Sequence, residues 1–597
     1  MPAVTIRGNG SPRSPRRSVE TYDDINRSRI ILGFLLLVCS IFIIRAFYLQ
    51  IIRHDHYSKV ALNYQLKEYQ IPAERGVIRA RNGSSTTPLV LNETKYTLFA
   101  DPIYIKDASS DAKAISQIIG KDASDVEQLL KTPKTRYVVL SKKLSRDQHE
   151  AISKLDIKGV GTREESYRTY PQGELASQVL GFVNDDGKGQ YGVEEFMNDT
   201  LSGEVGELKA ITDAKGVPLV SNPDNVIKEP EAGRAVTLSI DMGIQKRVEE
   251  ILKSGLDRAK SQKGSLMVMD PNTGKVVAMA SWPTYNPDNI SAVNDISALN
   301  NNNTSGAIEV GSIMKVLTTS TALDQGVVSA NTAFYDAGFV EVGDSKITDT
   351  HNSEGTQTVE SLLVESLNTG AVWLLRQIGK GGINERARFT WYNYMTEKFK
   401  LGSVTGIEQA GEASGLIPKP EDKGQGIDVI YANTSFGQGM MATPVQMGAA
   451  FSSVLNGGKY YKPSIIDSIR DEKGNDIKHD PVVVSEKIVG NSVTQDIINL
   501  TQKVATKNIP GIAREGYMIG GKTGTAEIAK PEGGYYKDRF NGTYMGFVGG
   551  DRPEYVIVVS AIEPKIPGYA GSQAAAPIFR DTVNMLLDNV GVNPKSH

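Results

Sequence analysis

The stretch Glu309-Val-Gly-Ser312-Ile-Met-Lys315-Val-Leu-Thr-Thr319 places a serine and a lysine three residues apart. Residues at this spacing lie one above the other on one face of a helix, so the pattern predicts a hydroxyl beside an amine. An amine buried away from water can lose its proton near neutral pH and then take the serine proton, which makes a nucleophile for acyl transfer. Gly311 suits a tight turn into the helix. The motif alone is weak, because Ser-x-x-Lys also occurs by chance on ordinary exposed helices.

Length and composition narrow the kind of protein. With 597 residues the chain is too long for one domain, and 40% apolar residues are enough for real cores. The net charge of -3 argues against a general nucleic-acid binder. The single cysteine, Cys39, excludes a disulfide framework or a cysteine-based zinc site within one chain. We therefore expect a multidomain protein that binds no nucleic acid.

The N-terminal region predicts a membrane anchor. Residues 1–29 carry six arginines among Ser, Pro and Gly, which is typical of a disordered basic tail. Residues 30–52 are apolar around Arg45 and long enough to cross a membrane as one helix. A cleaved signal peptide is the alternative, but no small-residue cleavage site follows this stretch. The arginine-rich flank predicts a cytoplasmic N-terminus, with everything after residue 52 outside the cytoplasmic membrane.

Residues 53–232 show no catalytic constellation. They mix short strand patterns, such as 95–100, with a helical pattern over 112–130, and Gly and Pro interrupt them often. We interpret this region as an elongated mixed α/β pedestal.

From about Gly233 the predicted strands and helices become longer and more regular. Their order predicts a second, α+β domain over 233–590. The chain gives a strand over 235–240, a helix capped by Asp241, and a hairpin over 265–280. Helical patterns occupy the middle of the region, around 312–323 and 359–378. The last expected elements are strands over 544–549 and 555–562, a helix over 577–587 and a tail over 591–597. Strands at both ends of a mainly helical middle predict an antiparallel sheet closed by terminal segments.

Two further short motifs lie in this region. Ser366-Leu-Asn368 precedes Thr369-Gly370, and the run Asn-Thr-Gly marks a turn that can present a second hydroxyl and an amide at a loop edge. Lys522-Thr523-Gly524-Thr525 lies in a run that predicts a strand. Its ammonium, hydroxyls and main-chain N–H groups can receive an anionic peptide end.

The second of these motifs also fits another template. Residues 516–523 match the phosphate loop of Gly, four residues and Gly-Lys-Thr. A phosphate loop must open a helix, whereas here Gly524 follows at once and Pro531 breaks the next stretch. An extracytoplasmic location also offers little nucleotide. Nucleotide binding is therefore the alternative interpretation of this segment.

The three motifs in this order resemble the signature of penicillin-binding proteins and serine β-lactamases: Ser312-x-x-Lys315, Ser366-x-Asn368 and Lys522-Thr-Gly524. The surrounding runs look like the transpeptidase domain of class B penicillin-binding proteins, namely 264–280, 435–446 and 574–579. Three runs in the pedestal resemble the non-catalytic, dimerisation-like module of that class, namely 75–83, 168–173 and 192–203. The chain departs from the family pattern at Ala80, usually an acidic residue, and at Val310, usually proline.

The resemblance implies a β-lactamase-like antiparallel sheet flanked by helices, and it gives each motif residue a role. Ser312 attacks the carbonyl of the penultimate D-Ala in a stem peptide that ends in D-Ala-D-Ala, with Lys315 as the base. Ser366 relays a proton to the departing D-Ala, Asn368 orients the network, and Lys522 tunes its hydroxyls.

The strand motif is implied to bind the donor substrate. Thr523 and Thr525 help to hold the terminal carboxylate, and Gly524 lets the substrate backbone approach. The N–H groups of Ser312 and Thr525 form the oxyanion hole, and an amine of a neighbouring stem resolves the acyl-enzyme. No metal, nucleotide or other cofactor is required.

These implications lead to a membrane-anchored peptidoglycan D,D-transpeptidase that acts on stem peptides of the lipid-linked wall precursor and is inhibited by β-lactams. A D,D-carboxypeptidase or β-lactamase, and a non-enzymatic β-lactam sensor, are the alternatives. The pedestal shows no glycosyltransferase-like pattern, which implies a separate polytopic glycan polymerase as a partner. Other wall-synthesis or divisome proteins are expected as further partners. Ser-x-Asn and the run 347–352 favour the division type over the elongation type.

Overall fold

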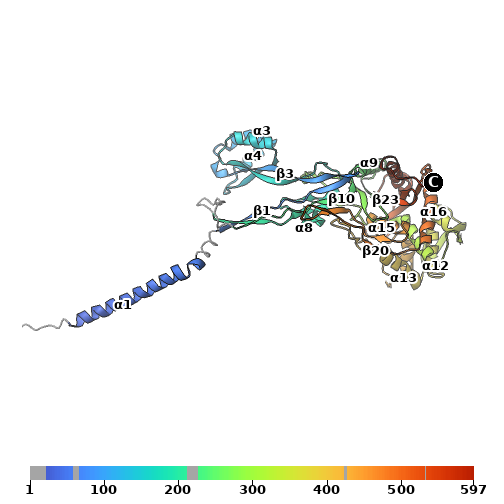
Figure 1. The fold of residues 1–597 in the computed structure, drawn as a ribbon. Helices are drawn as coiled ribbons and strands as arrows, with labels where there is room; N and C mark the ends of the chain where they lie inside the picture. Colours follow the sequence, from blue (N-terminus) through green and yellow to red (C-terminus); the bar gives the residue numbers. More distant parts are fainter. Residues whose placement is uncertain (1–21, 58–65, 212–225, 422–425, 532, 597) are drawn as a thin grey trace, which may run out of the picture. The chain divides into compact units, whose positions relative to one another are not determined.

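The computed structural model describes residues 22–57, 66–211, 226–421, 426–531 and 533–596 (Figure 1). The chain divides into two compact units, one made of residues 1–72 and 205–230, the other of residues 73–204 and 231–597. The polypeptide therefore passes from the first unit to the second twice.

The first unit contains the apolar helix. Helix α1 (Tyr22–Phe47) continues into a π-helical turn, η1 (Tyr48–Ile52). Within it, Arg27–Ile52 is long and apolar enough to cross a membrane, and its large apolar side chains are exposed, which fits a single-pass anchor. The basic tail expected over 1–29 lies outside the described residues up to residue 21, and the chain is helical from Tyr22. A small antiparallel sheet, in the order β1-β8-β9, completes the unit: β1 (Leu66–Ile71), β8 (Gly206–Ile211) and β9 (Val226–Lys228).

The second unit contains a long sheet whose strands come from both the pedestal region and the region after residue 233. The strand order is β19-β18-β10-β2-β3-β4, and β5 also pairs with β3. Its strands are β2 (Ile78–Asn82), β3 (Ser85–Ala100), β4 (Val138–Leu144), β5 (Val160–Thr169), β10 (Val236–Asp241), β18 (Ile466–Arg470) and β19 (Asp476–Lys478). Strand β10 pairs in parallel with β2 and antiparallel with β18, so strands from before and after residue 233 share one ladder. Ala80 is fully buried in β2, which explains why an apolar residue fits there.

Helices α3 (Ala108–Ile119), α4 (Ala123–Leu130) and α5 (Arg146–Lys154) share a small core with β3 and β4. The helical pattern expected over 112–130 is confirmed, but it is divided between two helices. Gly120 ends α3 in the left-handed conformation (φ 70°), and Asp122 starts α4 by accepting a hydrogen bond from the N–H of Ser124. The strand expected over 95–100 is confirmed as the end of β3.

The three pedestal runs quoted for the resemblance meet at one carboxylate. Glu194 is fully buried, and its two oxygens accept hydrogen bonds from Arg75 Nε and Arg168 Nε, both at 2.7 Å. Arg168 also donates to Asn92 Oδ1 at 2.9 Å. A buried carboxylate needs such paired partners, so this cluster fixes three distant segments of the chain to one another.

The second sheet is antiparallel, in the order β12-β11-β23-β22-β21. Its strands are β11 (Lys263–Met269), β12 (Val276–Trp282), β21 (Met518–Ala529), β22 (Tyr535–Gly549) and β23 (Pro553–Ile562). The expected hairpin, the two late strands and the closure by terminal segments are confirmed.

Helices cover both faces of this sheet. Helices α9 (Met242–Ala259) and α17 (Ala576–Met585) pack on one face, and α15 (Pro444–Leu455) and α16 (Asn491–Asn508) pack on the other. Asp241 caps α9 as expected, accepting from the N–H of Gly243 and of Ile244. Strand β21 is an edge of the sheet.

The helical region differs from the expected pattern at two positions. The helix expected over 312–323 is a 3-10 turn, η5 (Gly311–Ile313), followed by α10 (Met314–Asp324). The helix expected over 359–378 is interrupted, giving α11 (Val359–Glu365) and α12 (Asn368–Ile378). Other elements of this region are α13 (Glu385–Asn393), α14 (Ile427–Thr434), β13 (Ala333–Asp336), β14 (Phe339–Val342), β15 (Ser345–Thr348) and β16 (Gly355–Thr358).

The short elements connect these parts: η2 (Pro102–Tyr104), α6 (Ser177–Leu180), β6 (Phe182–Val183), β7 (Gly189–Gln190), α7 (Gly192–Phe196), α8 (Asn198–Ser202), η3 (Ile290–Ala292), η4 (Ile296–Leu299), η6 (Tyr394–Lys398), β17 (Tyr460–Tyr461), β20 (Val483–Ser485), η7 (Gly571–Ala575) and η8 (Leu586–Val590).

Candidate active site

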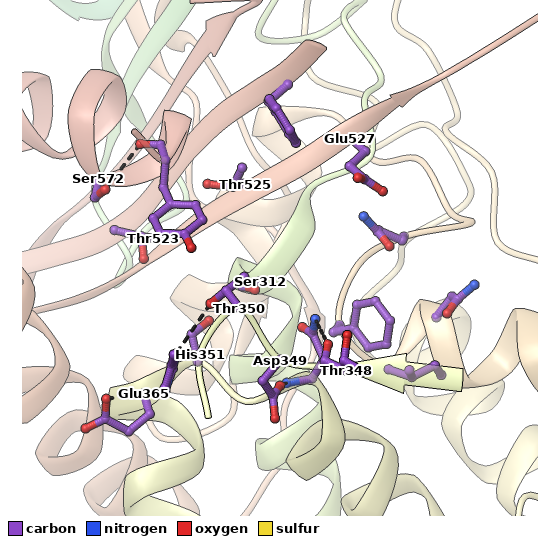
Figure 2. Close-up of a pocket in the computed structure, with 18 of the residues that line it drawn as sticks. Ser312, Thr348, Asp349, Thr350, His351, Glu365, Thr523, Thr525, Glu527 and Ser572 are labelled. Atoms are coloured by element: carbon purple, nitrogen blue, oxygen red, sulfur yellow. Dashed lines mark hydrogen bonds and ion pairs between the residues drawn. The ribbon is translucent and has the colours of Figure 1, made fainter. Parts of the chain in front are cut away.

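A cavity of about 680 Å³ lies along the edge strand β21. Figure 2 shows Thr523, Thr525 and Glu527 following one another along the strand, with Ser312 below them. The opposite wall comes from β15 and the residues that follow it, over 345–351, and from the end of α11. The cavity therefore brings together segments that lie far apart in the sequence.

Ser312 lies in the 3-10 turn at the start of α10 and lines the cavity. Gly311 before it has φ +62°, and a Cβ atom there would lie 2.7 Å from the carbonyl oxygen of Thr525. Glycine is required because it adopts this conformation freely and lets the turn pack directly on β21. Among the described residues no side chain accepts from or donates to the Ser312 hydroxyl, so this group is open to the cavity.

Lys315 is fully buried behind the cavity wall. Its Nζ donates to the carbonyl oxygen of Ser366 at 2.5 Å and to Asn368 Oδ1 at 2.8 Å, and lies 3.4 Å from Ser366 Oγ. Burial lowers the pKa of Lys315 well below its usual value, the positive charge of Lys522 lowers it further, and the carboxylate of Asp349 raises it in part. A neutral amine beside a serine hydroxyl is what a general base requires.

Ser366 interrupts the helical region between α11 and α12. It takes the left-handed conformation (φ 61°, ψ 45°), which is unusual for a residue with a side chain. The turn expected at Asn368–Gly370 was wrong, because these residues begin α12 instead. The strained position turns the Ser366 hydroxyl toward both lysines, since Lys522 Nζ donates to it at 2.9 Å.

Lys522 lies in the middle of β21 and is fully buried. Burial lowers its pKa to about 7. The phosphate-loop alternative was wrong, because residues 518–529 form a strand paired with β22 and open no helix. Only glycine fits at position 524, because a Cβ atom there would lie 2.2 Å from Thr543 Oγ1 and 2.6 Å from the carbonyl oxygen of Val310.

The structure thus brings the three motifs to one place. Five of the predicted site residues line the cavity: Ser312, Ser366, Asn368, Thr523 and Thr525. The other three, Lys315, Lys522 and Gly524, are buried behind them.

Asp349 is a residue that the motifs did not reveal. Its Oδ1 accepts from the N–H of Asn368 and, at 3.3 Å, from that of Thr369, and its Oδ2 accepts from Thr369 Oγ1 at 2.6 Å. It therefore serves as the cap of α12, whose N-cap residue Leu367 has no polar side chain. The only signal in the sequence was its place in the run 347–352.

Glu309 is the second such residue. Its Oε1 accepts from the N–H of Gly439 and from the hydroxyl of Tyr535, both at 3.0 Å, and burial raises its pKa. It therefore ties the segment before Ser312 to β22 at one end of the cavity.

Comparison with known proteins agrees with this geometry. Residues 264–584 match the family described as penicillin binding protein transpeptidase domain, and residues 70–238 match the penicillin-binding protein dimerisation domain. "Peptidoglycan D,D-transpeptidase FtsI" of Escherichia coli (strain K12) is 29% identical over 601 residues, covering 99% of this chain and 96% of that protein. "Stage V sporulation protein D" of Bacillus subtilis (strain 168) is 29% identical over 585 residues, covering 96% and 87%.

Solved structures show the same fold. Penicillin Binding Protein 2X from Streptococcus thermophilus has a TM-score of 0.69 and 25% identity, covering 88% of this chain and 80% of that chain. The matched family accounts for more than half of the sequence and contains all three motifs, and the predicted resemblance is confirmed. The chain belongs to the penicillin-binding protein transpeptidase family.

Proposed function

We propose that this chain is a membrane-anchored peptidoglycan D,D-transpeptidase of the division type, which cross-links stem peptides through an acyl-enzyme on Ser312. One observation carries the proposal: two buried lysines, Lys315 and Lys522, both contact Ser366, and Ser366 lines the same cavity as the hydroxyl of Ser312. The relatives that are named D,D-transpeptidases and align with nearly the whole chain support the same reaction.

Acylation follows from these contacts. Neutral Lys315 takes the proton of Ser312 Oγ, which attacks the carbonyl carbon of the penultimate D-Ala and forms a tetrahedral intermediate. The N–H groups of Ser312 and Thr525 stabilise its oxyanion. Ser366 Oγ then gives its proton to the leaving nitrogen and recovers one from the lysines, so the carbon–nitrogen bond breaks and D-Ala departs.

The remaining residues hold the reactants. Asn368 fixes the amine of Lys315 through its Oδ1, at 2.8 Å. Thr523 and Thr525 face the cavity and bind the terminal carboxylate of the donor, while Gly524 keeps the strand close to the turn that carries Ser312. β-Lactams acylate the same serine.

The biological setting is part of the proposal. The basic flank before the apolar helix supports a cytoplasmic N-terminus and a catalytic domain outside the membrane. The proposed boundaries follow the sequence pattern: a basic segment over 1–29, whose residues from Tyr22 already belong to α1, an anchor over 30–52, a pedestal over 53–232, a transpeptidase domain over 233–590 and a tail over 591–597. The lipid-linked precursor is polymerised by a separate partner. Depletion should make cells filament, whereas rounding would indicate the elongation type.

Labelling by a fluorescent penicillin tests the nucleophile. Ser312→Ala should abolish labelling of the full-length protein. Ser572→Ala should leave it intact, because that serine lines the same cavity but its hydroxyl donates to the carbonyl oxygen of Tyr569, at 3.2 Å, and accepts from no lysine among the described residues. Labelling that survives Ser312→Ala contradicts the proposal. Rapid turnover of the penicilloyl-enzyme would favour a hydrolase, and absence of cross-linking by the purified protein would favour a sensor.

A further inference from the structure

The proposed reaction needs a second substrate, the amine that resolves the acyl-enzyme. Formation and aminolysis of the ester follow one path in opposite directions, so the acceptor nitrogen must take the position that the leaving nitrogen vacates. In this cavity that position lies beside the hydroxyl of Ser366, which is held by Lys522. The part of the cavity wall next to Ser366 is therefore the part that an acceptor in this position would contact.

Three charged or titratable side chains form this part of the wall. Glu365 ends α11 immediately before Ser366, and one of its oxygens lies 3.8 Å from His351 Nε2 on the facing loop (Figure 2). Its other oxygen pairs with Lys507 Nζ on α16. All three line the cavity, and their side chains are 36%, 44% and 47% exposed for Glu365, His351 and Lys507, so a ligand can reach them.

Of the carboxylates that line the cavity, Glu365 is the one placed to bind an incoming ammonium. The lining holds three: Asp349, Glu365 and Glu527. The oxygens of Asp349 already accept hydrogen bonds from Asn368 and Thr369 at the start of α12. Glu527 lies beyond Thr525 on β21, on the side away from Thr523 and Lys522. Glu365 is therefore the accessible carboxylate on the Ser366 side.

A carboxylate is needed there for an electrostatic reason. Lys315 and Lys522 lie buried behind this wall, and any protonated lysine repels an incoming ammonium across a medium of low dielectric constant. Glu365, which is 36% exposed although it is paired with Lys507, offsets part of this repulsion at the mouth of the path. The imidazole ring of His351 beside it carries a nitrogen that can accept the proton that the amine must lose before it can attack.

We propose that Glu365 and His351 form the acceptor subsite, which receives a primary ammonium on a flexible side chain, such as that of a diamino acid in a neighbouring stem peptide. Lys507 and the Thr350 hydroxyl, 3.4 Å from His351 Nδ1, are the other groups that face this pair. This subsite rests on the transpeptidase function proposed above.

Aminolysis uses His351, Ser366 and the two buried lysines in turn. His351 takes one proton from the ammonium and releases it to solvent. The free amine attacks the ester carbonyl, a carbon–nitrogen bond forms, and the bond from the carbonyl carbon to Ser312 Oγ breaks. The second amine proton passes through Ser366 Oγ and the lysines to Ser312 Oγ, which restores the hydroxyl.

Partition of one acyl-enzyme between two acceptors tests the subsite. The full-length protein in detergent is acylated with an N-acyl-D-alanyl thioester, and hydrolysis and aminolysis are measured with stem peptides that carry a free lysine or diaminopimelate side-chain amine. Glu365→Gln and His351→Asn should each lower the aminolysis-to-hydrolysis ratio roughly tenfold, as expected for the loss of a contact to a charged group. Acylation by penicillin should stay within about twofold, because the donor side is untouched.

The chain offers a matched control on the same two helices. Lys503 and Glu360 form an ion pair between α16 and α11, at 2.5 Å, outside the cavity lining. Glu360→Gln should leave the ratio unchanged, and an equal loss there would overturn the proposal by showing that any ion pair between the helices suffices. Normal aminolysis in Glu365→Gln, or a selective loss in Glu527→Gln instead, would also overturn it. Failure of the wild type to use either amine contradicts the transpeptidase function itself, and with it the subsite.

Discussion

Replacement of Asp349 separates two effects of one carboxylate. Its oxygens accept hydrogen bonds from two N–H groups at the start of α12, and its charge raises the pKa of Lys315 against the effects of burial and of Lys522. Asp349→Ala removes both the cap and the charge. Asp349→Asn keeps a capping oxygen and removes only the charge, since asparagine caps helices about as well as aspartate.

The magnitudes follow from the contacts. A lost helix cap destabilises a protein by about 1 kcal/mol, and the hydroxyl of Thr369 keeps Asp336 as a second acceptor at 2.5 Å. We therefore expect Asp349→Ala to lower the free energy of unfolding by about 1–2 kcal/mol and Tm by roughly 2–5 °C. Asp349→Asn should lie within about 0.5 kcal/mol of the wild type.

The effect on catalysis has a definite sign. Without the carboxylate the pKa of Lys315 falls further, so the neutral amine is present at lower pH. The acid limb of the rate of penicillin acylation against pH should therefore move to lower pH in both variants, measured by stopped reactions with fluorescent penicillin. An unchanged limb, or one that moves to higher pH in Asp349→Asn, refutes Lys315 as the base. An unchanged Tm in Asp349→Ala refutes the cap.

Three more predictions concern other parts of the molecule. Glu194→Gln should lower the free energy of unfolding in urea by about 3–5 kcal/mol, because two buried guanidinium groups lose their partner, whereas Glu93→Gln, which breaks an exposed ion pair, should change it by less than about 1 kcal/mol. In the wild type, acylation by penicillin should rise with pH through the lowered pKa of Lys315 and then level off, and a rate that falls as the pH rises over that limb would contradict a neutral base. Gly311→Ala should lower acylation at least about tenfold, because its Cβ atom would lie 2.7 Å from the carbonyl oxygen of Thr525; a normal rate would show that the turn can move away from β21.

The sequence predicted those parts of the fold that rest on local signals. The hairpin over 265–280 and the cap at Asp241 depend on turn residues and on a side chain next to its own helix, and both are confirmed. The break at Ser366 left no comparable signal, because a serine in the left-handed conformation is held by contacts with Lys315 and Lys522 from distant segments. The break near Gly120 did carry a signal in the sequence, because a glycine is followed there by a capping aspartate. The helical periodicity of the apolar residues over 112–130 concealed that signal.

In the candidate site, too, local motifs were predictable from the sequence, whereas contacts between distant segments were not. The order of three motifs was enough to name the residues that now surround one cavity. The motif spacing placed Lys315 beside Ser312, but the direction of its amine toward Ser366 and Asn368 depends on packing. Asp349, His351 and Glu365 come together only when β15 and the residues after it fold against α11 and α12, and no short-range pattern encodes that approach.

Strand β10 has a practical consequence for dividing this protein. Because β10 pairs with β2 on one side and with β18 on the other, a fragment that begins at residue 233 would carry β10 as a bare edge. Its unpaired N–H and C=O groups would offer a template for strands of other molecules, and the apolar residues around β2 would lose their cover. Such a fragment is expected to aggregate, whereas a cut within the residues before β2 would leave the ladder whole.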